Sequence, residues 1–312
     1  MLLAVGVRRR TSWRDLEGYL FISPWLLGFL LFTLGPMLVS FGLSLTKWDL
    51  LRPTPLYVGL SNYQELLRDP DFFLSLRNTL YYTLVSVPVG MAGSLAVALL
   101  LNQKVRGIQV FRTIYYLPAV TSSVAMYLLW KWLLSPDLGL VNQMLQAHVP
   151  LLTLSGVHWV PLIASPPEWL ADPNWAIPAL ILMNLWYLGS GMIIYLAGLQ
   201  GVPEHLYEAA ELDGAGAWHK LRHITLPMLS PTIFFNLTMS IIGSFQVFTA
   251  AFVMTQGGPA KATLFYVLLL YQTAFDYLRM GSASAMAWIL FVVIVILTVI
   301  NFRVASRWVH YD

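Results

Sequence analysis

The stretch MGSASAMAWILFVVIVILTVINF, residues 280–302, runs from Met280 to Phe302 without a charged side chain. An α-helix needs about 20 apolar residues to cross the hydrocarbon core of a bilayer, so this stretch predicts a membrane-spanning helix. The composition agrees, because 58% of the residues are hydrophobic and 11% are charged. Ordinary soluble domains carry about 25% charged residues. These figures exclude a soluble globular domain, a disordered chain and a fibrous repeat.

Other uncharged stretches of spanning length precede this one. They are Gly18–Thr46, Asn78–Gln103, Thr113–Trp130, Pro173–Pro203 and His223–Ala260. We therefore expect an all-α polytopic membrane protein whose domain, residues 19–303, contains six transmembrane helices. The uncharged stretch Leu138–Pro167 is different, because its prolines break any long helix. It predicts a loop with a short interfacial helix around Leu140–Ala147.

The distribution of Lys and Arg predicts the orientation. Four arginines precede the first span, and cytoplasmic segments are enriched in such residues. They are Arg8, Arg9, Arg10 and Arg14. We expect the N-terminal segment 1–18 and the C-terminal tail 304–312 to be cytoplasmic. The loops Lys47–Arg77, Ser135–Asp172 and Thr255–Arg279 then lie outside. In Met1–Arg10 the apolar part precedes the arginines, so we expect an uncleaved anchor and no signal peptide.

The sequence lacks the residues that several kinds of chemistry require. The chain has no cysteine, which removes disulfides, thiolate metal sites and thiol nucleophiles. No lysine follows a glycine, so a phosphate-binding P-loop is absent. His219 and His223 stand four residues apart, and a polar surface pair is favoured over a zinc site. We expect no catalytic site, no metal and no cofactor of the chain's own. The spans also lack deeply placed charges, which indicates that energy enters from outside the membrane.

The segment 202–227 is the most informative loop. Pro203 suits the first turn of a helix and Gly214 its end. A second short helix is expected over Gly216–Arg222, and Pro227 opens the fifth span. Acidic residues and small alanines on the first helix suit anionic lipid poorly. A knob that docks into a groove of another protein fits better than an amphipathic helix lying on the membrane.

The spacing within this loop carries a family resemblance. The matching residues are Glu208, Ala209, Ala210, Gly214, Ile224, Leu226 and Pro227. The pattern resembles that of the permease subunits of binding-protein-dependent ABC importers. Further segments are similar to the carbohydrate branch, which includes the maltose, glycerol-phosphate and lactose permeases. These segments are 58–63, Asn78–Thr79, 116–119, 196–200, 243–248 and 255–259.

The resemblance implies a type I importer permease fold with cytoplasmic coupling helices. It implies that the seven loop residues couple the chain to a cytoplasmic ATPase, with Glu208 pairing with a basic group and Gly214 setting the angle between the helices. It also implies four kinds of partner: a second related permease, two ATPase subunits that bind ATP and Mg²⁺, an extracytoplasmic solute-binding protein, and membrane lipid. The expected location is a prokaryotic cytoplasmic (inner) membrane.

A sugar site needs short polar side chains and an aromatic platform. In the fifth span Asn236, Ser240 and Ser244 recur every four residues and form one stripe, with Phe245 and Gln246 beside it. Candidates in other spans are Asn184, Tyr187 and Ser123. Such residues also pack helices closely in bilayers, so both interpretations stay open. We expect a sugar-importing permease; the alternatives are an ABC permease for a non-sugar solute and, less favoured, an ion-coupled secondary transporter.

Overall fold

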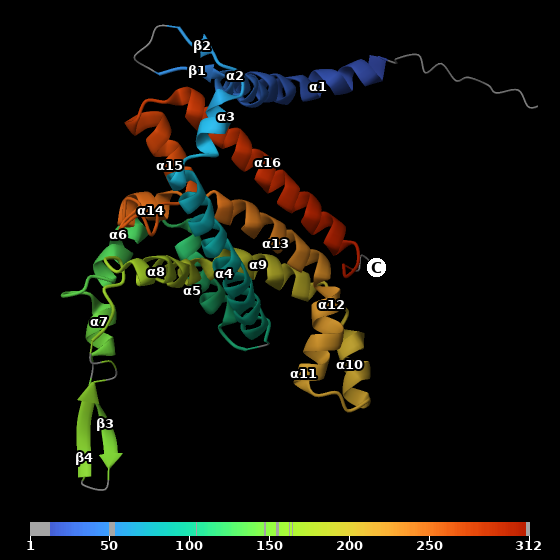
Figure 1. The fold of residues 1–312 in the computed structure, drawn as a ribbon. Coiled ribbons are helices and arrows are strands. Elements are labelled where there is room, and N and C mark those ends of the chain that lie inside the picture. The colour runs from blue at the N-terminus through green and yellow to red at the C-terminus, as the bar shows by residue number, and fades with distance from the viewer. Residues whose placement is uncertain are drawn as a thin grey trace, which may run out of the picture. The chain divides into compact units, whose positions relative to one another are not determined.

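The computed structural model describes residues 13–49, 54–103, 105–146, 148–153, 156–161, 163 and 165–309 (Figure 1). The expected cytoplasmic segments 1–18 and 304–312 therefore lie partly outside the described residues, and Arg8, Arg9 and Arg10 lie wholly outside them. The chain divides into two units. One is Met1–Leu66 with Thr273–Trp288, and the other is Leu67–Gln272 with Ile289–Asp312.

The first unit contains the beginning of the chain. Its elements are α1 (Trp13–Phe29), the π-helical turn η1 (Leu30–Leu34), α2 (Gly35–Ser44), β1 (Thr46–Lys47), β2 (Leu56–Tyr57) and α3 (Ser61–Leu66). The π-helical turn η4 (Gln272–Asp276) and the long helix α16 (Met280–Ala305) each run from one unit into the other.

The second unit contains the remaining elements. They are α4 (Pro70–Leu101), α5 (Ile108–Val120), α6 (Ser123–Leu133), α7 (Leu140–Leu145), β3 (His148–Thr153), β4 (Gly156–Pro161), α8 (Pro173–Asn184), the 3₁₀ turn η2 (Leu185–Tyr187), α9 (Leu188–Gln200), α10 (Glu204–Leu212), α11 (Ala217–Lys220), the π-helical turn η3 (Leu221–Thr225), α12 (Leu226–Met228), α13 (Ser230–Phe245), α14 (Thr249–Met254) and α15 (Tyr266–Tyr271).

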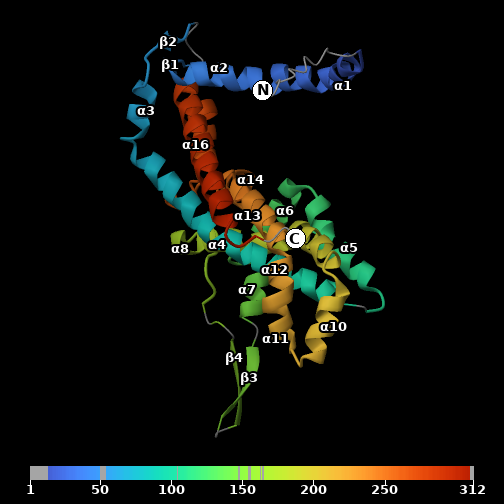
Figure 2. The same cartoon turned by 90° about the vertical axis from the view of Figure 1, so that its right-hand side faces the viewer.

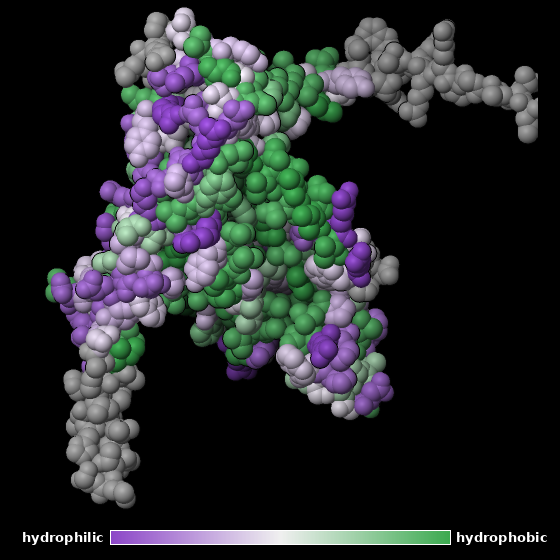
Figure 3. Space-filling view, in the orientation of Figure 1, coloured by the Kyte–Doolittle hydropathy of each residue, from purple (hydrophilic) through white to green (hydrophobic). Residues whose placement is uncertain are grey.

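Long apolar helical stretches confirm five of the six expected spans. Among the described residues, those long and apolar enough to cross a membrane are Gly18–Ser44, Pro70–Leu101, Pro173–Gln200, Ser230–Met254 and Met280–Ala305. In the second unit, hydrophobic residues cover the surface over α4 and α13 (Figure 3). This is the surface expected of helices surrounded by lipid.

The third expected span, Thr113–Trp130, is not one helix. It consists of α5 and α6, which meet at Thr121 and Ser122. Both residues are extended, with ψ of 157° and 120°. The hydroxyl of Thr121 donates to the carbonyl oxygen of Pro118 at 2.8 Å. The helix breaks here because Pro118 and the short hydroxyl side chains offer the backbone a local alternative to the helical ladder.

Two short antiparallel pairs of strands modify the all-α expectation. Strands β1 and β2 form one pair, and β3 and β4 form the other. The second pair lies within the stretch predicted as a loop, and α7 confirms the short helix expected at its beginning. Local strand pairing satisfies backbone groups that no helix between these prolines could satisfy.

In the first unit, a buried asparagine joins the end of α2 to α3. The Asn62 side chain donates to the carbonyl oxygens of Ser44 at 2.7 Å and Thr46 at 2.8 Å. Gly281 of α16 packs against the same Thr46 carbonyl, where a Cβ atom would overlap it. Arg279 pairs with Glu65 at 2.8 Å on the surface. The buried asparagine therefore fixes where the first span ends.

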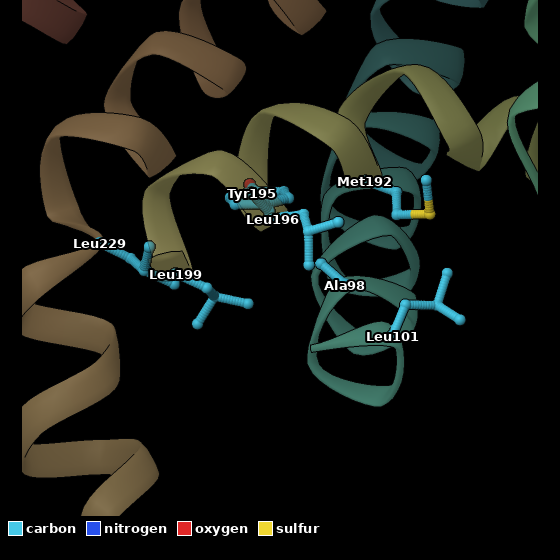
Figure 4. Packing of buried hydrophobic residues seen from close by; sticks show 7 residues of the cluster. All are labelled: Ala98, Leu101, Met192, Tyr195, Leu196, Leu199 and Leu229. Atoms are coloured by element: carbon cyan, nitrogen blue, oxygen red, sulfur yellow. The ribbon is translucent and has the colours of Figure 1, made fainter. Parts of the chain in front are cut away.

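In the second unit, α9 packs between α4 and α13. The apolar cluster consists of Ala98, Leu101, Met192, Tyr195, Leu196, Leu199 and Leu229 (Figure 4). Glycine permits the close approach of α9 to its neighbours, because a Cβ at Gly189 would overlap the Tyr115 backbone of α5. The Ser94 hydroxyl adds a hydrogen bond to the Leu188 carbonyl at 3.0 Å. Small residues and short hydroxyls are the usual means of joining helices in a bilayer.

Gly189→Ala should lower the stability of the protein, because the added methyl group overlaps a main-chain carbonyl that cannot rotate away. Overpacking of this kind costs about 1–3 kcal/mol. Thermal unfolding in detergent measures the effect. Gly28→Ala in α1 is the control, since no atom lies within 4 Å of its new Cβ. Equal unfolding midpoints for the two variants would contradict the packing described here.

Candidate functional site

A cavity of about 500 Å³ lies within the second unit. Its walls come from α4, α6, the η2–α9 segment, α13 and the beginning of α14. Its volume falls within the range of pockets that hold small ligands, roughly 300–1,000 Å³.

The polar stripe of α13 forms one wall. Asn236, Ser240 and Ser244 all line the cavity, and so does Gln246 directly after the helix. Because α13 ends at Phe245 and α14 begins at Thr249, the intervening backbone leaves the helical path beside the cavity. The structure thus brings together the residues that the four-residue spacing selected.

The other sequence-predicted candidates divide into two groups. Asn184 and Tyr187 line the cavity, at the point where α8 gives way to the turn η2. Phe245 and Ser123 are not among the lining residues. Phe245 is 2% exposed and packs away from the cavity, while Ser123 is the exposed first residue of α6. The helical rotation of about 100° per residue turns Phe245 away from the Ser244 face.

Sequence reasoning missed a second stripe on α4. Tyr82, Ser86, Gly90 and Ser94 recur every four residues and also line the cavity. The same four-residue spacing that selected the α13 stripe could have found these residues. Tyr82, Ser86 and Ser94 each carry only one hydroxyl group, however, so the pattern is easily overlooked in an apolar stretch. Tyr127 of α6 adds another ring, with its centroid 6.3 Å from that of Tyr187.

The cavity contains hydrogen-bonding groups and no charge. No Asp, Glu, Lys, Arg or His side chain is among the described residues that line it. Within the described part of the chain, four buried side-chain atoms lack a hydrogen-bond partner, and two of them belong to lining residues. These are the Tyr187 hydroxyl and the Asn236 amide nitrogen. Buried polar atoms without partners are costly. The hydroxyl and amide groups of the lining are suited to a ligand that carries hydroxyl groups.

A second functional element projects from the ends of α9 and α12. It is the helical hairpin of α10 and α11, visible in both views (Figures 1 and 2). Gly214 turns the chain with φ of +78°, as expected for a residue that ends a helix. Pro203 is the N-cap residue and not the first helical residue. Pro227 lies in α12, so the fifth span begins at Ser230 and not at Pro227.

Hydrogen bonds hold the hairpin as one body. Lys220 pairs with Glu211 at 2.7 Å, and this contact lowers the pKa of the Glu211 carboxyl below its usual value. The Tyr207 hydroxyl lies 3.0 Å from that of Thr225. The Ala215 amide donates to the Ala210 carbonyl at 2.8 Å. The two helices are therefore fixed relative to each other.

The hairpin exposes two large apolar side chains among charged and polar ones. Leu212 is 90% exposed and Trp218 is 70% exposed. Glu208 and Ala209 are exposed with them, whereas Ile224, Leu226 and Pro227 are half-buried at the base. Leu212 and Trp218 were not selected from the sequence, because any apolar residue of a short loop could be packed inward. A protruding apolar face rimmed by charge is typical of a protein-binding surface.

A comparison with known protein families identifies the family of this chain. Residues 89–310 match the family described as the binding-protein-dependent transport system inner membrane component. This chain belongs to that family. The matched region contains most of the cavity-lining residues and the whole hairpin.

Curated relatives cover nearly the whole chain. The probable ABC transporter permease protein YesP of Bacillus subtilis is 40% identical, over 96% of this chain and 93% of the relative. The lactose transport system permease protein LacF of Rhizobium radiobacter is 35% identical, over 92% of each chain. The trehalose/maltose transport system permease protein MalF of Thermococcus litoralis is 32% identical, again over 92% of each.

A solved structure has the same fold. It is a bacterial alginate ABC transporter in complex with an alginate pentasaccharide-bound periplasmic protein. One of its chains superposes with a TM-score of 0.78 at 25% identity, covering 96% of this chain and 98% of that chain. The type I importer permease fold expected from the sequence is confirmed.

Because the natural chain has no cysteine, introduced cysteines report on the cavity. Ser240→Cys should react with a small water-soluble thiol reagent, since Ser240 lines the cavity. Phe245→Cys should not react, since its side chain is 2% exposed. Mass spectrometry of the labelled, purified protein measures both. Labelling of Phe245→Cys at the rate of Ser240→Cys would contradict the orientation of α13.

Proposed function

We propose that this chain is the transmembrane permease subunit of an ATP-driven ABC importer that moves a sugar into the cytoplasm by alternating access. The sugar is delivered by an extracytoplasmic binding protein. The observation that carries the proposal is the rigid α10–α11 hairpin with its exposed apolar face. A permease that hydrolyses no ATP itself needs such a contact to receive work from separate ATPase subunits.

The hairpin is built to transmit force. In the proposal Leu212 and Trp218 enter a cleft of the ATPase, Glu208 pairs there with a basic group, and Ala209 and Ala210 permit close approach. The helices are held together by the Lys220–Glu211 pair at 2.7 Å, so displacement of the hairpin is passed to its base. There Ile224, Leu226 and Pro227 lead directly into α13, whose polar stripe lines the cavity. Rigid-body movement of this kind is a common way to switch between two states.

A saccharide is the solute class that suits the cavity. Several relatives are named for sugars, including lactose, trehalose or maltose, and arabinooligosaccharides. Sugars present hydroxyl groups and an apolar ring face, which match the Asn, Ser and Gln side chains and the tyrosine rings of the lining. We assign Asn236, Ser240, Ser244 and Gln246 as hydroxyl contacts, with Asn184 and Tyr187 opposite them. The uncharged lining favours a neutral saccharide over an anionic one.

The proposal includes the remaining partners and the orientation. A second related permease and two ATPase subunits, which bind ATP and Mg²⁺, complete the transporter. The termini and the α10–α11 hairpin lie in the cytoplasm, and the binding protein docks on the outer loops. The family is an inner membrane component of binding-protein-dependent transport, which disfavours the ion-coupled carrier. An ABC permease for a non-sugar solute is the alternative.

Glu208→Arg should abolish sugar-stimulated ATPase activity of the reconstituted transporter while the protein still inserts into the membrane. The reversed charge would be desolvated against a basic partner, which costs several kcal/mol. Arg106→Glu is the control, since Arg106 is exposed in the loop between α4 and α5. Normal stimulation in Glu208→Arg would refute the coupling role of the hairpin.

Native mass spectrometry of the detergent-purified complex tests the assembly. We expect one copy of this chain, one related permease and two ATPase chains. Two copies of this chain with two ATPases would keep the mechanism and overturn the heterodimer. This chain alone, still able to transport, would overturn the ATP-driven proposal.

A further inference from the structure

One segment of the second unit starts at the cavity and ends against a residue that lines it. At its start, Phe248, Thr249 and Ala250 line the cavity. At its end, the ring of Phe265 packs 5.2 Å from the ring of Tyr82, centroid to centroid, and Tyr82 also lines the cavity. We call residues 248–266 the returning segment. It lies beyond the α13 stripe, in the direction assigned to the extracytoplasmic side.

Two adjacent residues of α4 hold the returning segment. The Asn78 side chain donates to the carbonyl oxygens of Lys261 at 3.0 Å and Leu264 at 3.3 Å. The Thr79 hydroxyl oxygen accepts a hydrogen bond from the Tyr266 amide at 2.9 Å. Asn78 is 5% exposed and Thr79 is fully buried. Releasing the segment would leave several buried polar atoms without partners, so these bonds favour a permanent attachment.

The backbone of the returning segment is strained where it is exposed. Gln256, Ala260 and Lys261 have positive φ values of 52°, 44° and 62°, and all three side chains are exposed. Residues with a Cβ atom adopt this conformation only when the surroundings require it. Here the requirement comes from inside, because the fully buried Thr263 donates to the Gly258 carbonyl at 2.6 Å.

A surface ion pair adds a second attachment. Lys261 contacts both carboxylate oxygens of Asp71, at 2.6 and 2.8 Å. Both side chains are well exposed, 57% for Lys261 and 36% for Asp71. Exposed pairs contribute little to stability. The pair therefore marks the attachment of the segment to α4, while the buried bonds of Asn78 and Thr79 maintain it.

Tyr82 connects this attachment to the cavity. It stands one helical turn after Asn78 on α4, on the same face, and it both contacts the Phe265 ring and lines the cavity. A shift of the returning segment would therefore change the cavity wall at Tyr82 and at Phe248 together.

We propose that Asn78 and Thr79 are positioning residues that make the returning segment a rigid end wall of the cavity. The wall moves as one body with α4 and keeps the solute from returning to the outer side during each cycle. This inference rests on the proposed transport function. The role that it assigns to Asn78 and Thr79 is neither hydrophobic packing nor contact with the solute.

The ratio of sugar transported to ATP hydrolysed tests the role of Thr79 in the complete transporter in proteoliposomes. Thr79→Val removes the hydroxyl acceptor at nearly constant volume and should lower the ratio about fivefold, the scale of one lost hydrogen bond. Thr79→Ser keeps the acceptor and should retain the wild-type ratio. Asn78→Ala should behave like Thr79→Val, and Asn102→Ala at the exposed end of α4 is its control.

A merely structural role gives a different result. It would lower transport and ATP hydrolysis in proportion, because fewer transporters would be active, and an unchanged ratio in Thr79→Val and Asn78→Ala would overturn the inference. The wild-type transporter separates the two proposals. If it shows no sugar-stimulated ATPase activity, the proposed function is wrong. If the wild type is normal and the variants keep its ratio of sugar transported to ATP hydrolysed, only the end-wall inference is wrong.

Cross-linking decides whether the wall is rigid or opens. The double variant Asp71→Cys with Lys261→Cys can be bridged by a short bifunctional thiol reagent, and the two single variants are controls. The bridged transporter should retain transport, because the wall and α4 move together. Loss of transport on bridging, restored by reduction of a cleavable reagent, would show an opening gate and overturn the proposal. Failure to bridge would contradict the contact itself.

Discussion

The hydrocarbon core of a bilayer offers no hydrogen-bond partners, and this constraint organises most of the structure. Backbone groups at membrane depth must be satisfied within the chain, which favours long helices. Helices are interrupted here at a few places, and two interruptions line the cavity. These are the 3₁₀ turn at Leu185–Tyr187 and the gap between α13 and α14, from Gln246 to Phe248. Irregular backbone within the membrane is tolerated where it borders a polar cavity, so the breaks and the cavity belong together.

Outside the bilayer the same chain follows the opposite rule. On the α10–α11 hairpin two large apolar side chains are exposed beside the surface Lys220–Glu211 pair: Leu212 is 90% exposed and Trp218 is 70% exposed. In water such an arrangement is unfavourable for an isolated chain. It becomes favourable when a partner covers the apolar face. In the proposed function, that partner is a subunit of the ATPase.

Helix α9 connects these two regions. Its close packing against α5 through Gly189, and against α4 through Ser94 and Leu188, leaves little freedom for independent movement. It contributes Tyr195 to the cavity and leads within a few residues into α10. The return path from the hairpin enters α13, the helix that carries the polar stripe. Both ends of the hairpin are thus continuous with helices that line the cavity, and the proposed coupling uses this connection.

The sequence by itself determined the membrane class, five of the membrane spans, the turn at Gly214 and the stripe of Asn236, Ser240 and Ser244. These features depend on local composition and helical spacing, which can be read along the chain. Tertiary structure alone decided which helices face one another. It showed that the α4 stripe also lines the cavity, excluded Phe245 and Ser123 from the lining, and divided the third span at Thr121. It also joined Asn78 to Lys261 and Leu264, far apart in the chain. Spacing along one helix determines which residues share a face, but only the packing of that helix against others determines what the face meets.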